Sequence, residues 1–397
     1  MNFNKSILGV FIVCFVLGIY SCNRNSYQIN TSRLAYLRSI QIPTIDISSE
    51  SSRQVIIAQG TEDLRQGHPS TILMPDGKTM FVIWTKGHGG PVSFFKKSTD
   101  GGLTWSQLMD VPDSWNNYAN CPPLYLLEDP DGVQRLTTFV NRGPNGMKMY
   151  RAVYDEPQMK WSPFEPVIIA GSVDTLIADV MPFTAIEPVD GGEKLLGFTN
   201  IRRPYDVGKT NVLAQSSSLD GGQSWSSWRI ILDLGNPYRP CEPEVIRSPS
   251  GNQLLMIIRE NDRNLNSWLM ISNNEGVTWS EPFQAPASVT MDRHQACYAK
   301  DGRLVIVGRD VAESSQTNGH FVAWVGTYED LINGREGQYR VKLLHSYKTT
   351  EYPGLEMLPD GTFVATNSVS YRPNENYSVV STRFTLEELD QKLKKSL

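Results

Sequence analysis

Six hairpin signals recur at nearly even spacing along the chain, and this recurrence limits the fold more than any other feature. Each signal is an Asp-Gly or Ser-Gly pair between two apolar runs, a pattern that favours a tight turn between antiparallel strands. The turn glycines are Gly77, Gly132, Gly191, Gly251, Gly302 and Gly361, at successive spacings of 55, 59, 60, 51 and 59 residues. Self-similarity at such a period is typical of a propeller or a solenoid.

A second motif follows three of these hairpins. Residues 98–105 read STDGGLTW, residues 218–225 read SLDGGQSW, and residues 272–279 read SNNEGVTW, with a weaker copy, YDEPQMKWSP, in the second unit. Ser and Asp side chains in a tight turn bond nearby backbone amides, and Gly supplies a positive φ. We interpret the motif as a turn between outer strands, with its Trp packed between units. Four strands in each of six units predict an all-β fold, a six-bladed β-propeller of four-stranded antiparallel blades.

The two ends of the chain depart from this repeat. The final residues, TLEELDQKLKKSL, predict a short amphipathic C-terminal helix that opens with a capping box from Thr385 to Glu388. Residues 1–21 combine one early Lys with an apolar run that is short for a membrane span and typical of a signal peptide. We expect residues 22–45 to form a flexible tether and residues 46–397 to form the propeller domain.

The end of the apolar run, Ile19-Tyr20-Ser21-Cys22, resembles a bacterial lipoprotein signal in which Cys22 becomes the lipidated first residue. The resemblance implies an exported protein, anchored by lipid in the outer leaflet of a membrane of the bacterial cell envelope, on the periplasmic side or at the cell surface. An ordinary signal peptide that contains a Cys is the alternative.

Charge and cysteine content narrow the possible partners. The formal net charge is −5 and no long basic run occurs, which disfavours nucleic acid as a partner. The mature chain retains three cysteines, Cys121, Cys241 and Cys297. Their odd number argues against a disulfide framework, and their spacing fits no metal site. We expect them to be buried free thiols. The oligomeric state does not follow from these features.

Aligning the six hairpins on their turns shows which residues reach the rim around a central pit. Eight residues before the Asp or Ser of each turn stand His68, Pro123, Pro182, Glu242, Arg293 and Tyr352. Solvated loop charges would be the simplest interpretation, but equivalent positions in successive repeats favour one shared site. Several arginines also fall at this rim, and converging guanidinium groups suit a carboxylate ligand because they bind it through paired hydrogen bonds.

The Ser-x-Asp-x-Gly-x-Thr-Trp turn resembles the Asp-box, or bacterial neuraminidase repeat, of the sialidase superfamily. The match is strongest in 98–105 and 218–225, whereas Asn274 replaces Asp in 272–279. The resemblance covers about residues 50–385. It implies an exo-acting glycosidase that releases a terminal sialic acid or a related acidic sugar from a glycan. It implies no metal and no organic cofactor, and a Tyr nucleophile sets such enzymes apart from glycosidases that use two carboxylates.

Residues for each role can be matched by their place in the repeat. Arg65 in LRQGHPSTIL, Arg259 in LLMIIR and Arg309 in LVIVGRD resemble the three arginines that hold the substrate carboxylate. Tyr352 in EYPGLEM resembles the nucleophile, and Glu242 resembles the Glu that activates it. A neutral hydroxyl with a neighbouring base suits attack beside a substrate carboxylate, because a carboxylate nucleophile would be repelled. We therefore expect the Tyr352 hydroxyl about 2.6–3.2 Å from the Glu242 carboxylate.

Four further residues are candidates for the pocket: His68, Arg293, Arg239 and Asp179. Arg293 competes with Arg309 for the third arginine position. Each nominated side chain also has a structural interpretation, Tyr352 as a tyrosine bonded to backbone and Glu242 as a partner of a nearby arginine.

One departure from the sialidase pattern concerns the acid/base residue. Sialidases place an Asp near the end of the second strand of the first blade, where this chain reads WTKGHGGP. His88 is the nearest titratable side chain apart from a lysine, and a His can serve as general acid and base. Asp63 and Asp179 are weaker substitutes for the missing Asp.

Two other functions remain open at this point. A propeller polysaccharide lyase would use a His and a Tyr for β-elimination on a uronic acid whose carboxylate the arginines neutralise. A non-catalytic glycan-binding surface lipoprotein would share the fold without the chemistry, since a fold does not determine a function. Release of a saturated acidic sugar, formation of an unsaturated uronate, or binding without turnover would distinguish the three.

Overall fold

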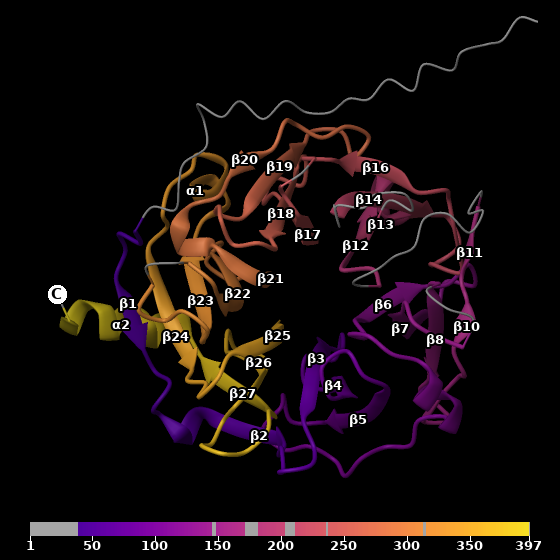
Figure 1. Cartoon of the computed structure of the whole chain (residues 1–397), viewed down its shortest axis with the longest axis horizontal. Coiled ribbons are helices and arrows are strands. Elements are labelled where there is room, and N and C mark those ends of the chain that lie inside the picture. The colour runs from indigo at the N-terminus through magenta and orange to yellow at the C-terminus, as the bar shows by residue number, and fades with distance from the viewer. Residues whose placement is uncertain are drawn as a thin grey trace, which may run out of the picture.

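A computed structural model describes residues 39–144, 148–170, 182–202, 211–235, 237–312 and 315–396. Their strands form six antiparallel blades arranged in a ring around a central axis (Figure 1). This confirms the predicted six-bladed β-propeller. The predicted lipidation site Cys22 and the candidate Asp179 lie outside the described residues.

The innermost strand of each blade is the first strand of a predicted hairpin, and the later strands lie successively further out. Blade one contains β3 (Gln66–Leu73), β4 (Met80–Lys86) and β5 (Val92–Ser98). Blade two contains β6 (Leu124–Glu128), β7 (Gln134–Val140), β8 (Tyr150–Asp155) and β10 (Glu165–Pro166), with β9 (Lys160–Trp161) paired to β8. Blade three contains β12 (Ala185–Val189), β13 (Lys194–Arg202), β14 (Asn211–Ser218) and β16 (Arg229–Leu232). Beside it, β11 (Ile168–Ile169) pairs with β15 (Ser224–Trp225).

The second half of the ring repeats this order. Blade four contains β17 (Pro240–Arg247), β18 (Leu254–Glu260), β19 (Trp268–Ser272) and β20 (Phe283–Gln284). Blade five contains β21 (Met291–Tyr298), β22 (Leu304–Asp310), β23 (Phe321–Gly326) and β24 (Tyr339–Leu344). Blade six contains β25 (Thr350–Met357), β26 (Phe363–Val369) and β27 (Ser378–Phe384).

The two N-terminal strands join the last two blades, so that blade six has the predicted four strands and blade five has one more. The strand β2 (Gln54–Ala58) pairs antiparallel with β27 and forms the outer strand of blade six. The ring is therefore closed by joining the beginning of the propeller to its last blade (Figure 1). The strand β1 (Thr44–Asp46) pairs in parallel with β24 as a fifth strand of blade five, and it begins inside the predicted tether. Blade one has three strands within the described chain.

The predicted turns have the backbone that their sequence requires. All six hairpin glycines have a positive φ, from 71° at Gly77 to 92° at Gly361. In the first Trp-containing turn, residues 98–105, the Ser98 hydroxyl accepts a hydrogen bond from the Gly102 amide, and Asp100 accepts from the Leu103 and Thr104 amides. The third box keeps this geometry, because the Asn274 side chain oxygen accepts from the Thr278 amide. The motif is therefore a structural turn, as predicted.

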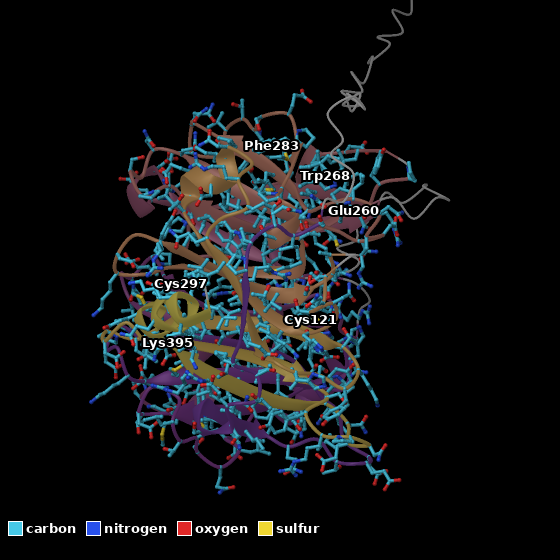
Figure 2. All side chains as sticks on the ribbon, turned by 90° about the vertical axis from the view of Figure 1, so that its left-hand side faces the viewer. Cys121, Glu260, Trp268, Phe283, Cys297 and Lys395 are labelled. Carbon is cyan, nitrogen blue, oxygen red and sulfur yellow. The ribbon has the colours of Figure 1, made fainter. Side chains whose placement is uncertain are left out.

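Apolar side chains from adjacent blades interlock to form the core, and side chains fill the space between the ribbons (Figure 2). In blade four, Trp268 lies buried on β19 and Phe283 follows on β20 (Figure 2). Three free thiols lie among the described residues, of which Cys121 and Cys241 are buried and Cys297 is partly exposed. The absence of disulfides among the described residues leaves this interlocking as the main source of stability.

Helices are few and peripheral. The C-terminal helix α2 (Leu386–Ser396) opens with the predicted capping box, in which Thr385 and Glu388 exchange hydrogen bonds. A one-turn helix, α1 (Tyr328–Ile332), follows β23. In the part of the chain that the structure describes, four 3₁₀ turns lie at Ser51–Arg53, Asp113–Asn117, Asp190–Gly192 and Ala287–Val289. Within the described ranges, no helix is long and apolar enough to cross a membrane.

Candidate active site

A break in strand pairing recurs near the rim end of four inner strands. Regular pairing skips between Gly67 and Ser70, Cys241 and Glu244, Asp292 and Gln295, and Thr350 and Pro353. Inside three of these bulges, His68, Glu242 and Arg293 have φ of 43°, 50° and 54°. A residue with a side chain in this conformation stores about 1–3 kcal/mol of strain, which accumulates at functional sites. Each bulge interrupts the regular alternation of side chains along its strand and so changes the direction of the nominated side chain.

The predicted contact between Tyr352 and Glu242 is present. The Tyr352 hydroxyl donates a hydrogen bond to Glu242 Oε1 at 2.6 Å, across 110 residues of sequence. The other carboxylate oxygen of Glu242 pairs with Arg259 Nη1 at 2.8 Å. Glu242 is fully buried and Tyr352 is partly buried. Blades four and six therefore contribute one connected unit at the central pit.

The protonation states of this pair follow from their surroundings. Burial raises the pKa of Tyr352 well above its ordinary value, and the adjacent Glu242 raises it further. Burial alone would also raise the pKa of Glu242, but Arg259 and the hydrogen bond from Tyr352 outweigh it and lower the pKa. The resting pair is thus a neutral phenol donating to a carboxylate, and the hydroxyl is a nucleophile only when Glu242 takes its proton.

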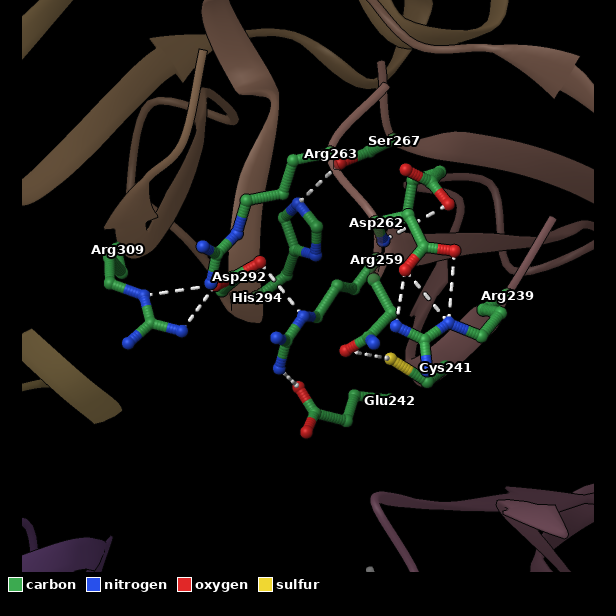
Figure 3. Close-up of polar contacts among 12 residues, drawn as sticks. Arg239, Cys241, Glu242, Arg259, Asp262, Arg263, Ser267, Asp292, His294 and Arg309 are labelled. Carbon is green, nitrogen blue, oxygen red and sulfur yellow. Dashed lines mark hydrogen bonds and ion pairs between the residues drawn. The ribbon is translucent and has the colours of Figure 1, made fainter. Parts of the chain in front are cut away.

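Asp292 is a second buried carboxylate that holds three arginines together (Figure 3). Its oxygens lie 2.8 Å from Arg259 Nε, 2.7 Å from Arg263 Nη2 and 2.9 Å from Arg309 Nε. The contact with Arg259 is an ion pair that is poorly aligned as a hydrogen bond. Arg309 Nη1 also donates to the Thr350 carbonyl at 2.8 Å, which ties blade five to blade six. Two of the nominated arginines therefore already have protein partners.

Arg239 and Arg65 are paired as well. Arg239 forms a two-pronged contact with Asp262, with Nε 2.8 Å from Oδ1 (Figure 3). Arg65 pairs with Glu351, and its guanidinium carbon lies 3.9 Å from the centre of the Tyr377 ring. These pairs orient the arginines and reduce their net charge.

Glu351 was not found from the sequence. It lies in the β25 bulge beside Tyr352, is almost fully buried, and accepts a hydrogen bond from the His68 amide at 2.9 Å. Burial would raise its pKa, but His68, the hydrogen bond with His88, and Arg65 lower the pKa to about 2. The one feature of the sequence that could have indicated Glu351 is its position next to Tyr352. The alignment of the hairpins on their turns selected one residue from each inner strand, and in this strand it selected Tyr352.

His88 contacts this carboxylate. His88 Nδ1 lies 3.1 Å from Glu351 Oε1, and its ring is largely exposed. A carboxylate on Nδ1 fixes the orientation of the ring and leaves Nε2 for another group. His88 therefore has the geometry of a general acid and base oriented by Glu351.

His68 lies between His88 and the tyrosine. Its ring centre is 4.4 Å from that of His88 and 4.5 Å from that of Tyr352, on which it stacks. Burial is the main reason that the pKa of His68 falls to about 4, so its ring is neutral at neutral pH. His68 thus packs on Tyr352 through an uncharged contact.

The donor atoms of His68, His88 and Glu351 lie within 4.8 Å of one another, as in a metal site. They do not suit a cation. His68 Nδ1 already accepts a hydrogen bond from the Gly89 amide at 3.0 Å, and Arg65 occupies Glu351. A metal ion would need to displace both partners and would be repelled by the guanidinium.

Two further titratable side chains are not part of this cluster. His294 on β21 is buried, and its Nε2 lies 3.1 Å from the Val289 carbonyl oxygen. Asp63 is exposed in the loop before β3. Arg293, by contrast, borders a central cavity of about 120 Å³ together with His68 and Tyr352.

The same cavity contains Glu244, which offers a test by pH. Burial raises the pKa of Glu244 to about 8, above its ordinary value of 4.5, although Arg293 opposes the shift. The folded protein therefore keeps a proton on Glu244 that the unfolded chain loses. The contribution of this proton to the free energy of unfolding is full below pH 4.5 and is lost as the pH rises toward 8. We expect Glu244→Gln to flatten the fall of unfolding free energy between these pH values, by about 1–4 kcal/mol. Urea unfolding of the wild type and of Glu244→Gln at several pH values measures this difference. Parallel pH profiles of the two proteins would contradict the prediction.

Comparison with known proteins gives similarity in structure alone. No protein-family model matches the chain, and no curated protein matches its sequence. An α-L-arabinofuranosidase from Fusarium graminearum, in complex with an iminosugar inhibitor, superposes with a TM-score of 0.63 at 14% identity, over 85% of this chain and 98% of that one. An α-L-arabinanase from Penicillium chrysogenum, complexed with arabinobiose, has a TM-score of 0.60 at 15% identity, over 85% and 98%.

A sialidase-type enzyme is among the similar structures too. The intramolecular trans-sialidase from Ruminococcus gnavus, in complex with oseltamivir carboxylate, has a TM-score of 0.59 at 15% identity, over 84% of this chain and 97% of that one. At such identities the likeness shows a shared propeller fold. The chemistry of this chain must be argued from its own residues.

Proposed function

We propose that the protein is a retaining exo-glycosidase that uses Tyr352 as its nucleophile. The observation that carries the proposal is the 2.6 Å hydrogen bond from Tyr352 to the buried Glu242, at the rim of a central pit. Propeller proteins of similar fold include enzymes that act on sugars, in agreement with this class of reaction.

The proposed reaction assigns one residue to each chemical step. The Tyr352 oxygen attacks the anomeric carbon, its proton passes to Glu242, and the bond to the leaving oxygen breaks as His88 protonates that oxygen. Water then attacks the same carbon, gives its proton to His88, and frees the tyrosine, which regains its proton from Glu242. Two displacements at one carbon give net retention. Because Glu242 is a weak base at rest, its proton transfer is coupled to the positive charge that develops at the anomeric carbon.

The charge of the site favours an acidic sugar, such as a terminal sialic acid, as the substrate. Six arginines lie at the site, against four carboxylates and Glu244, whose pKa of about 8 keeps it mostly protonated at neutral pH. The arginines are Arg65, Arg239, Arg259, Arg263, Arg293 and Arg309, and the carboxylates are Glu242, Asp262, Asp292 and Glu351. The excess of positive charge attracts an anion in a protein whose net charge is −5. A neutral nucleophile is also compatible with a neighbouring substrate carboxylate.

The decisive experiment is a screen of sugars released from sialylated and plant-derived glycans, read by mass spectrometry. Release of a saturated acidic monosaccharide supports the proposal. An unsaturated uronate would instead identify a lyase, and binding without turnover would identify a glycan-binding protein.

The role of His88 has its own test. We expect His88→Ala to lower turnover on a natural glycan by about 10²–10⁴-fold, the usual contribution of a general acid. The loss should be much smaller on a nitrophenyl glycoside, since that leaving group departs without protonation. His345→Ala is the matched control. His345 is exposed just after the outer strand β24 of blade five, and its ring contacts the rings of His320 and Tyr347. Equal losses on both substrates would assign His88 a structural role.

Export and lipid attachment at Cys22 are also proposed, on the signal-like N-terminal sequence. In a bacterial host, labelled fatty acid should be incorporated into the wild type and lost in Cys22→Ala. Incorporation that persists in the variant, or is absent from both, would rule out this anchor.

A further inference from the structure

The loop that carries His88 has little packing of its own. It joins β4 to β5 and contains the run Gly87-His88-Gly89-Gly90, and the His88 side chain is 64% exposed. Gly87 and Gly89 have φ of 81° and 61°, a left-handed conformation that glycine adopts without steric cost. Glycine also loses the most conformational freedom on folding, so this loop needs fixed contacts to hold His88 in one place.

His68 supplies such a contact from the bulge of β3. Its Nδ1 accepts a hydrogen bond at 3.0 Å from the amide of Gly89, the residue that follows His88. Its own backbone amide donates to Glu351 Oε2 at 2.9 Å, and the other oxygen of that carboxylate lies 3.1 Å from His88 Nδ1. The backbone beside His88 and the carboxylate that orients its ring are therefore both bonded to His68.

The ring of His68 also lies against the proposed nucleophile. The His68 and Tyr352 rings stack with 4.5 Å between their centres and 29° between their planes. Only 2% of His68 is exposed, so close packing holds its ring between Tyr352 and the loop. One buried side chain therefore connects the loop of the acid/base residue to the tyrosine.

A buried histidine that only fills space is the competing interpretation. Burial lowers the pKa of His68 to about 4, and because Nδ1 accepts from Gly89, the proton of the neutral ring lies on Nε2. This Nε2 is buried with no acceptor among the residues that the structure describes, which costs about 1–3 kcal/mol. The φ of 43° adds backbone strain. Stability alone therefore does not explain a histidine here, whereas the acceptor on Nδ1 does.

We propose that His68 is a positioning residue, whose Nδ1 holds the Gly89 amide and thereby keeps His88 in place for protonation of the leaving oxygen at Tyr352. The inference rests on the proposed function for the roles of His88 and Tyr352. The anchoring of the loop is tested without turnover.

Two substitutions separate the acceptor from the ring. His68→Phe keeps a ring against Tyr352 and has no acceptor, while His68→Asn lacks the ring, places its oxygen near the position of Nδ1, and tolerates a positive φ. The substrates are sialyllactose and the nitrophenyl glycoside of N-acetylneuraminic acid. The readout is the ratio of the two kcat values, which does not depend on how much of the enzyme is folded.

We expect His68→Phe to lower turnover of sialyllactose relative to the nitrophenyl glycoside by about tenfold or more, because only the natural leaving group needs the general acid. His68→Asn should keep the wild-type ratio. In a His88→Ala background, His68→Phe should change the ratio no further, since the general acid is already absent. A wild-type ratio in His68→Phe, or losses that multiply in the double variant, would overturn the proposal.

His294→Phe is the matched control. His294 is also fully buried, and burial lowers its pKa to about 4 as well, but its Nε2 lies 3.1 Å from the Val289 carbonyl oxygen and not at the His88 loop. This substitution should lower the melting temperature and leave the ratio of the two kcat values unchanged. A ratio that falls equally in His294→Phe and His68→Phe would show a general effect of losing a buried histidine.

Hydrogen exchange of the Gly89 amide, followed by NMR at pH 7, tests the anchor without a substrate. The amide should exchange slowly in the wild type and in His68→Asn, and at least tenfold faster in His68→Phe. If His68→Phe does not fold, His68→Gln, whose oxygen falls near the position of Nε2 instead, gives the same comparison. Equal exchange with and without the acceptor would overturn the anchor.

The two readouts distinguish failure of the anchor from failure of the proposed function. Faster exchange in His68→Phe, with no turnover of any glycan by the wild type, would keep the anchor and reject the glycosidase. Turnover by the wild type, with exchange and the ratio of kcat values unchanged in His68→Phe, would keep the glycosidase and reject the positioning role.

Discussion

Tyr352→Phe is expected to lower turnover on the natural glycan by about 10³-fold or more, because loss of a nucleophile removes the covalent step. The substitution deletes one oxygen and leaves the ring that stacks on His68. Binding of the acidic sugar should be nearly unchanged, so the loss should appear in kcat and not in KM. Steady-state kinetics with the released sugar as the readout measures both parameters.

The chain offers a matched control for this prediction in Tyr125. Its hydroxyl donates to the Phe183 carbonyl at 2.9 Å, and it borders the same central cavity as Tyr352. Tyr125→Phe should cost about 1 kcal/mol of stability and leave turnover close to wild type. Near-native turnover of Tyr352→Phe would show that Tyr352 is a structural tyrosine, and the glycosidase mechanism would be wrong.

Asp292→Asn is expected to destabilise the protein by about 3–5 kcal/mol, the range for breaking a buried ion pair from one side. Asp292 is fully buried and contacts Arg259, Arg263 and Arg309, so its neutral form leaves three guanidinium groups without their shared anion. Arg259 would also shift relative to Glu242, and activity should fall with stability. Urea unfolding at pH 7 measures the change in free energy.

Asp262→Asn is the control for Asp292→Asn. Asp262 pairs with Arg239 at the same rim, but about a quarter of each side chain is exposed, 26% and 29% respectively. Water screens such a pair, and its loss should cost about 1 kcal/mol or less. If both variants lose equal stability, Asp292 is not the buried anchor of the arginine network.

Much of the fold could be read from the sequence because its signals are local. An Asp-Gly or Ser-Gly turn and the Trp-containing turn each depend on a few adjacent residues, and the period of the hairpin turns indicates six similar units. The capping box that begins α2 is local in the same way. The contact between Tyr352 and Glu242 was also predictable, since equal positions in repeated hairpins reach the same rim once the ring closes.

The pairing of charges could not be read in this way. Arg65 pairs with Glu351, which lies 286 residues away in the sequence. Which arginine pairs with which carboxylate depends on how adjacent blades are oriented relative to each other. The bulges that display Glu351 beside Tyr352 leave no mark in the turn spacing, because they belong to the strand and not to its hairpin. Closure of the ring by β2 likewise depends on an edge that only the last blade provides. The sequence by itself determined six blades and a cationic rim. Only the tertiary structure decided which arginines are neutralised and that Arg293 lacks a partner among the described residues, because electrostatic pairing acts over space and not along the chain.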